Sequence, residues 1–210
     1  MTGTPITLTT EDADKLLDRL AEYPIGVVKQ PKRIRNHCMA LLMLDAGLRV
    51  GEVVKLYQID LQLGYVPITS LRITANIAKN KTERIVPLSN RIRTAVLNMS
   101  TWWWEQDTSG NHYAFYQGQN SNQTLTTRQV ERIIRDAAMK SLGRPVHPHV
   151  LRHTFASRLM RTTNARVVQE LLGHQHMSTT QIYTHPNEDD KKKAIESLDQ
   201  NQPNKNDTQS

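Results

Sequence analysis

Apolar residues recur along this chain at two different periods, and each change of period marks a new element. The first helical spacing, i, i+3, i+4, i+7, is formed by Ala13, Leu16, Leu17 and Leu20. Thr9 or Thr10, just before it, can cap this helix. A second helix is expected to run to about Leu44. Gly47 is expected to separate it from a further helix that begins near Leu48.

The two-residue period of a β-strand replaces the helical spacing in the segment LRITANIA, residues 71–78. The polar turn KNKTE follows, and RIVPL then predicts a second strand that ends at Pro87. Together they predict a hairpin with a cationic tip. The helical period returns from Ser89 to Trp103. Three consecutive tryptophans at 102–104 cannot all face inward on one helix, so at least one is expected at an edge or an interface.

The second half of the chain is predicted to be mainly helical. Residues 105–123 are rich in Gly, Asn, Gln and Ser and are expected to be loop, apart from a short strand at 113–116. Thr126 and Gln129 form a capping box for the next helix, which is expected to stop at Gly143. Three more helix starts are predicted, at Pro148, Asn164 and Ser178.

The pattern as a whole predicts one mainly α domain with a small antiparallel β-sheet (α+β). This domain is expected to cover residues 1–198. The remaining segment DQNQPNKNDTQS, residues 199–210, has no apolar residue to bury, so it is expected to be a disordered polar tail.

Composition and charge narrow the class of protein. The 210 residues include 27 Lys and Arg against 20 Asp and Glu, a formal net charge of +7, which favours a polyanionic partner. The single Cys38 excludes an intrachain disulfide framework and fits a reducing compartment. The longest apolar run, Cys38 to Leu44, is far shorter than the ~20 residues that span a bilayer. The polar, acidic N-terminal segment is unlike a signal peptide, so a cytoplasmic protein is expected.

Six of the eight histidines lie between His147 and His185, and a metal site is the first explanation to consider. His149 and His153 are four residues apart on a predicted helix, as in the zinc motif H-E-x-x-H. However, Val150 occupies the position of the glutamate in that motif, and the chain has no cysteine pair. The sequence therefore predicts no metal site.

A phosphate site explains the same region better. His149 and Arg152 are three residues apart and can reach one ligand from the same helix face. A guanidinium group suits two phosphate oxygens, and an imidazole can donate a hydrogen bond or exchange a proton. His174 directly follows a predicted helix end at Gly173, and Tyr183 comes nine residues later.

Two further cations precede this region: Arg49 follows Gly47, and Lys79 lies in the predicted hairpin tip. Each residue has an ordinary structural explanation when taken alone. Arg49 can pair with Glu52, and Lys79 and Lys81 can be solvated turn residues. His149 and His174 can bind backbone groups at helix ends, and Tyr183 can be a half-buried core residue. The joint order Arg, Lys, His-x-x-Arg, Gly-His, Tyr is what favours phosphate chemistry.

Four stretches containing these residues resemble the catalytic domain of the tyrosine recombinases, the phage-integrase and Xer-type family. They are GLRVGEVVKL, KNKTERIVPL, HPHVLRHTFAS and LLGHQHMSTTQIYTH, and the similarity runs from LTTEDADKLL to about IYTH. The resemblance implies the tyrosine recombinase catalytic-domain fold. It also implies a site-specific recombinase or integrase that breaks and rejoins DNA strands without metal, ATP or another cofactor.

In that family, the residue matching Tyr183 attacks the scissile phosphodiester, forms a 3′-phosphotyrosyl link and releases a 5′-hydroxyl. The resemblance makes His149 the base for the phenol proton, and Arg49 and Arg152 the clamp on the non-bridging oxygens. A phenol with a pKa near ~10 needs such a base or a strongly cationic setting at neutral pH.

The resemblance also assigns the residues around the leaving group. Lys79 would protonate the departing 5′-oxygen, with Lys81 as the alternative, and His174 would donate a hydrogen bond to the phosphate. Glu52 would orient Arg49 or a histidine.

Double-stranded DNA is the implied partner, with self-association into a tetramer on DNA and accessory DNA-bending proteins. A prokaryotic or phage-encoded, nucleoid-associated protein with no membrane association is expected. The catalytic pattern begins within ten residues of Met1, so no separate N-terminal core-binding domain is expected. Three alternatives remain at this point: an inert DNA-binding protein of the same fold, a type IB topoisomerase-like enzyme, and a metal-dependent nuclease.

Overall fold

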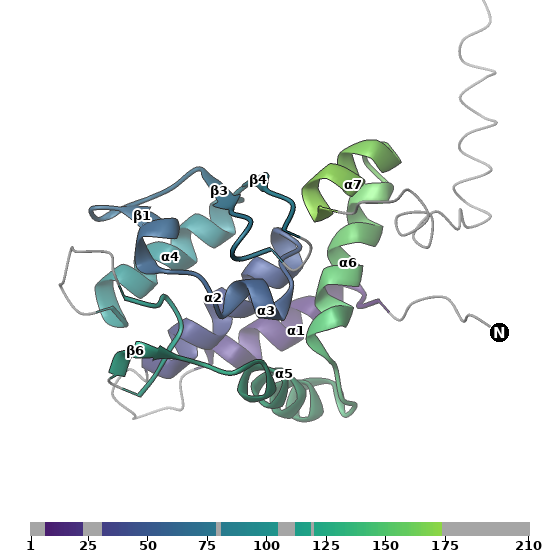
Figure 1. Cartoon of the computed structure of the whole chain (residues 1–210). Helices are drawn as coiled ribbons and strands as arrows, with labels where there is room; N and C mark the ends of the chain where they lie inside the picture. The colour runs from purple at the N-terminus through teal and green to yellow at the C-terminus, as the bar shows by residue number, and fades with distance from the viewer. Residues whose placement is uncertain (1–6, 23–30, 79–80, 105–111, 119, 174–210) are drawn as a thin grey trace, which may run out of the picture.

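A computed structural model describes residues 7–22, 31–78, 81–104, 112–118 and 120–173. The described chain is mostly helical, and its strands form three separate two-stranded antiparallel sheets rather than one. Figure 1 shows the helices gathered around α2, with the short sheets at the periphery. The predicted fold class, mainly α with small antiparallel β structure, is confirmed.

The helices begin and end close to the predicted positions. They are α1 (Thr10–Ala21), α2 (Pro31–Asp45), α3 (Val50–Val53), α4 (Asn90–Trp102), α5 (Thr127–Leu142), α6 (Pro148–Met160) and α7 (Ala165–Leu172), with a 3₁₀ turn at Gln58–Asp60. The side chain of Thr9 accepts a hydrogen bond from the Asp12 amide at 3.0 Å. Thr126 and Gln129 form the predicted capping box, and Gly143 ends α5 in the left-handed conformation. The helix expected after Ser178 lies outside the described residues.

Two predictions about the segment after Gly47 are wrong in detail. The helix expected to begin near Leu48 is α3, which is only four residues long, because Val54 and the residues after it turn away into the 3₁₀ segment. The strand expected over 71–78 is β3 (Ser70–Ile73), and residues 74–77 form a turn. β3 pairs with β4 (Arg84–Pro87), so the hairpin itself is confirmed.

The remaining strands were missed or misplaced by the pattern. β1 (Gln62–Leu63) and β2 (Val66–Pro67) form a short hairpin around Gly64. β5 (Tyr116–Gln117) pairs with β6 (Asn120–Thr124) where a strand at 113–116 was expected. β6 has the sequence NSNQT, with no apolar alternation that could reveal it.

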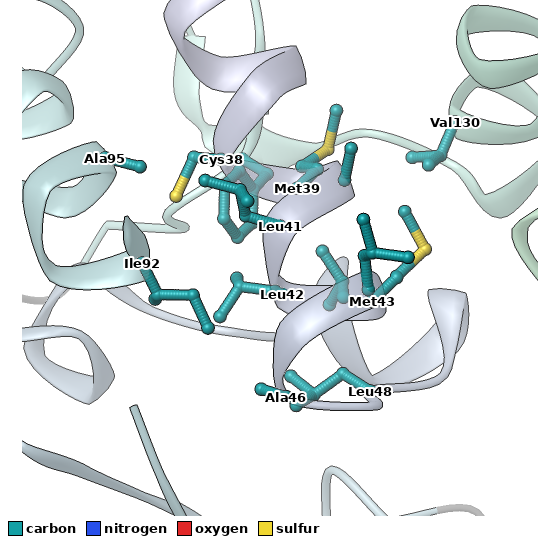
Figure 2. Close-up of a cluster of buried hydrophobic side chains, with 14 of the residues drawn as sticks. Cys38, Met39, Leu41, Leu42, Met43, Ala46, Leu48, Ile92, Ala95 and Val130 are labelled. Carbon is teal, nitrogen blue, oxygen red and sulfur yellow. The ribbon is translucent and has the colours of Figure 1, made fainter. Parts of the chain in front are cut away.

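Helix α2 is the centre of the hydrophobic core. Every side chain from Cys38 to Leu44 is buried, because α1, α4 and α6 all pack on this helix. Figure 2 shows these side chains between Ile92 and Ala95 of α4 on one side and Val130 of α5 on the other. Burial raises the pKa of the Cys38 thiol to about 12, so this cysteine is an inert core residue.

The three tryptophans divide as expected. Helix α4 ends at Trp102, which is 46% exposed, whereas Trp103 and Trp104 are buried. The Trp104 indole donates a hydrogen bond to the Ala114 carbonyl at 2.9 Å. No helix in the described part of the chain is long and apolar enough to cross a membrane.

Candidate active site

The carboxylate of Glu52 lies buried on α3 and is surrounded by Arg49 from the start of the same helix and by arginines from two distant segments. The Arg49 guanidinium donates to Glu52 Oε1 at 3.1 Å, and the Arg49 backbone amide donates to Oε2 at 2.8 Å. Arg84 on β4 donates to both oxygens, at 3.0 and 2.7 Å. Arg152 on α6 lies 4.0 Å from Oε2. Three guanidinium groups against one carboxylate leave positive charge in excess.

Burial alone would raise the pKa of Glu52, because it disfavours the charged form. Hydrogen bonds from Arg84, the charge of Arg84, the Arg49 amide and the charge of Arg152 oppose this effect, and the pKa of Glu52 lies below its ordinary value. Glu52 is therefore an anion at neutral pH and a fixed anchor for the arginines around it.

Arg49 immediately precedes α3, and its side chain is 18% exposed. Arg49 forms the ion pair with Glu52 that would give it a purely structural role. Arg49 also lines a large cavity next to α3. One guanidinium nitrogen and the backbone amide of Arg49 both donate to Glu52, so the guanidinium is held at the cavity wall.

Arg152 is only 5% exposed and binds the main chain of two segments. Its guanidinium donates to the Gly47 carbonyl and, at 2.8 Å, to the Leu172 carbonyl at the end of α7. Gly47 has a φ of +64°, and a Cβ there would collide with the ring of Phe155 on α6. The loop before Arg49 is thus packed directly on α6 and held there by Arg152.

A cavity of about 760 Å³ opens beside this cluster. Arg49, Glu52, Lys55, Lys81, Glu131 and His149 are among the side chains that line it. His149 is exposed in the first turn of α6, and Lys81 is exposed in the turn before β4, with a φ of +55°. The structure therefore brings Arg49, His149 and the alternative acid Lys81 to one cavity.

A second cavity of about 320 Å³ adjoins α5. Arg128, Arg132, Arg135 and His147 line it, and Glu131 lines both cavities. Cationic side chains thus continue from the first cavity along the exposed face of α5.

Three of the predicted site residues, Lys79, His174 and Tyr183, lie outside the described residues. The described chain ends at Gly173, whose position at the end of α7 was predicted. Within the described ranges, no group of three or more His, Cys, Asp and Glu side chains could hold a metal ion. Burial, followed by the charges of His149 and Arg152, lowers the pKa of His153.

Sequence reasoning missed Arg84. Its burial follows the strand alternation, because Arg84 and Val86 point inward while Ile85 is 64% exposed. The available signal in the sequence was that Arg84 falls on the same side of the strand as the buried Val86. The reason for burying an arginine there is the Glu52 carboxylate, which only the structure places next to it.

Comparisons with known proteins show which family and fold this chain is similar to. The family model described as "Phage integrase family" matches residues 7–190. Tyrosine recombinase XerC of Chromobacterium violaceum is 38% identical over 152 residues, which cover 71% of this chain and 48% of the relative. Tyrosine recombinase XerA of Pyrococcus furiosus is 32% identical over 196 residues, 91% of this chain and 61% of the relative. The chain thus spans about half to three fifths of these curated relatives.

Solved structures show the same fold. A crystal structure of XerA recombinase matches with a TM-score of 0.68 and 28% identity, over 96% of this chain and 67% of that one. The Tn1549 transposon integrase, solved with a circular intermediate DNA, matches with a TM-score of 0.68 and 18% identity, over 94% of this chain and 67% of that one. The matched family model covers most of the chain, including the segments that carry Glu52 and its arginines, and the chain therefore belongs to the phage integrase family.

Proposed function

We propose that this protein is a site-specific DNA recombinase that cleaves and rejoins strands through a 3′-phosphotyrosyl intermediate. The observation that carries the proposal is the arginine cluster around Glu52 at the wall of a cavity that also holds His149 and Lys81. Excess positive charge in a partly buried setting suits a phosphodiester whose negative charge grows in the transition state.

The described residues support distinct roles in this reaction. Arg49, oriented by Glu52, binds a non-bridging phosphate oxygen from the cavity wall. His149, exposed at the same cavity, accepts the phenol proton of Tyr183. Arg152 adds positive charge next to Glu52, and its guanidinium is held in place by the Gly47 and Leu172 carbonyls. His174 is proposed as a further hydrogen-bond donor to the phosphate.

The reaction balances without an external energy source. The Tyr183 oxygen forms a bond to phosphorus as the bond to the 5′-oxygen breaks, and a lysine gives that oxygen a proton. Attack by the 5′-hydroxyl of a partner strand reverses these steps and releases the tyrosine. The phosphodiester energy is kept in the covalent link, so ATP is not needed.

Double-stranded DNA is the proposed substrate. The arginines of α5 form a cationic surface next to the cavity, as expected for contacts to neighbouring phosphates. The Tn1549 integrase structure of the same fold holds DNA, which supports the same class of ligand here. From the resemblance to its family, we also propose that the protein forms a tetramer on DNA and acts with accessory DNA-bending proteins.

Covalent capture tests the proposed function. The full chain is incubated with a library of nicked duplexes whose arms are randomised, so that cleavage releases the short fragment that carries the new 5′-hydroxyl and the strand cannot be rejoined. We expect a protein–DNA adduct that survives denaturation, forms in EDTA and maps to a tyrosine by mass spectrometry. The recovered strands identify a preferred duplex for all later measurements.

The other outcomes identify the alternative functions. Binding of duplexes without any adduct would favour an inert DNA-binding protein. Cleavage abolished by EDTA and restored by a divalent ion would favour a metal-dependent nuclease. Relaxation of supercoiled DNA without recombinant product would favour a type IB topoisomerase-like enzyme.

The identity of the general acid is tested with a changed leaving group. Lys79→Ala is expected to cleave the captured duplex slowly, and to recover when a sulfur replaces the bridging 5′-oxygen. A thiol has a pKa near ~8.5, so it leaves without being protonated. Lys81→Ala, which changes an exposed residue of the same hairpin, is the control and is expected to show no such recovery. Recovery of the Lys81 variant alone would instead make Lys81 the acid.

A further inference from the structure

The Arg84 side chain binds two groups that lie outside its own hairpin, the Glu52 carboxylate and the Leu171 carbonyl. Its two terminal nitrogens bind the two oxygens of Glu52 at 3.0 and 2.7 Å. Its Nε donates to the Leu171 carbonyl in the last turn of α7, at 2.9 Å. The side chain is 3% exposed, so these contacts are shielded from water.

These contacts join three segments that carry proposed catalytic residues. Arg84 itself lies on the second strand of the hairpin and follows Lys79 and Lys81 in the sequence. Glu52 holds Arg49, and Leu171 lies just before Gly173 and His174 in the sequence. A Cβ at Gly173 would lie 3.1 Å from Cδ of Arg84, so the end of α7 packs tightly on this side chain. Figure 1 shows α7 next to α6, with the β3–β4 hairpin beside them.

We propose that Arg84 is a positioning residue for strand cleavage, which fixes Glu52, and through it Arg49, relative to the β3–β4 hairpin and the end of α7. The inference rests on the proposed function. Arg84 does not line the cavity and is not proposed to touch DNA.

The geometry favours positioning over simple stabilisation. A buried ion pair can often be replaced by apolar side chains at little cost in stability, because desolvation offsets the attraction between the charges. A planar guanidinium that binds a carboxylate with two nitrogens and a helix carbonyl with the third fixes direction as well as distance. Catalysis needs such precision, since a shift of about 1 Å can cost about a hundredfold in rate.

The test removes both charges of the Arg84–Glu52 pair together in a double variant. Arg84→Met, Glu52→Gln and the double variant are compared with wild type for melting temperature, affinity for the captured duplex and single-turnover cleavage rate. The control is Arg72→Met, which breaks the exposed pair between Arg72 and Glu83 on the same hairpin. We expect the double variant to fold and bind, but to cleave about a hundredfold more slowly. We expect the Arg72 variant to match wild type.

Two further readouts separate positioning from a loss of folded protein. First, Arg84→Met and Arg49→Ala should be non-additive, because Arg84 acts through Arg49. Second, Arg84→Met should gain an acid limb in its pH–rate profile. Glu52 then faces only Arg49 and Arg152, burial favours its neutral form, and its protonation as the pH falls releases Arg49. The melting temperature measured over the same pH range shows whether the rate falls in the folded enzyme or through a loss of folded protein.

A folded double variant that cleaves at the wild-type rate would overturn the inference. Additive effects of Arg84→Met and Arg49→Ala, together with an unchanged pH profile, would also overturn it. If neither Arg84→Met nor the double variant folds, the role of Arg84 is structural and the inference is likewise overturned. The wild-type chain is measured in the same assay. If it forms no adduct, the proposed function fails, whereas normal cleavage by the double variant rejects only the role of Arg84.

Discussion

Replacing Tyr183 with phenylalanine is expected to abolish the covalent adduct while leaving duplex binding close to wild type. The phenol oxygen is the atom that becomes esterified, and neither water nor another side chain can replace it in the same position. The loss should be at least about 10⁴-fold, as for other covalent nucleophiles. Denaturing gels of the captured duplex measure the adduct, and gel shifts measure binding.

Tyr65→Phe is the matched control. Tyr65 lies between β1 and β2, is 58% exposed, and does not line the large cavity. It should form the adduct at the wild-type rate. An adduct that persists in the Tyr183 variant would show that another residue is the nucleophile, and mapping of the linked peptide would identify it.

Arg152→Ala is expected to lower both stability and cleavage. The substitution leaves the Gly47 and Leu172 carbonyls without their donor and removes one of three cations from around buried Glu52. Unsatisfied buried groups of this kind cost about 3 kcal/mol in total, measured as the free energy of unfolding in urea. The rate should fall by about 10²–10³-fold, because an electrostatic contribution to the transition state is lost.

Two other variants make this result interpretable. Arg152→Lys keeps the charge but cannot bind two carbonyls in the same plane, so it should recover part of the rate and less of the stability. Arg158→Ala removes a half-buried cation of the same helix, whose guanidinium lies 3.5 Å from the Thr9 carbonyl, and should change neither quantity by much. Wild-type stability and cleavage in Arg152→Ala would contradict the assignment of Arg152 to the site.

Local sequence patterns predicted most of the helices because their determinants are local. The cap at Thr9, the capping box of Thr126 and Gln129, and the stop at Gly143 each depend on residues within one turn. The weak points were short elements whose sequence carries little period. α3 has only four residues, and the β1–β2 hairpin has two residues in each strand.

The site divides in the same way. From the order of residues alone, Arg49, His149 and Arg152 were identified as a group, and the structure places them around Glu52 and its adjoining cavity. Arg152 was expected to face phosphate, whereas its guanidinium is turned to main-chain carbonyls. A local pair with Glu52 and a place in the phosphate site are both compatible with the sequence around Arg49, and in the structure Arg49 forms the pair and also lines the cavity.

By itself, the sequence determined the helices, their caps and the residue types available for phosphate chemistry, because propensity and capping act between near neighbours. Only the tertiary structure decided that Arg84 and Arg152 meet at Glu52, 32 residues from one and 100 from the other. The strength of a buried ion pair depends on distance, orientation and exclusion of water. Those quantities exist only after α3, β4, α6 and the end of α7 have packed together.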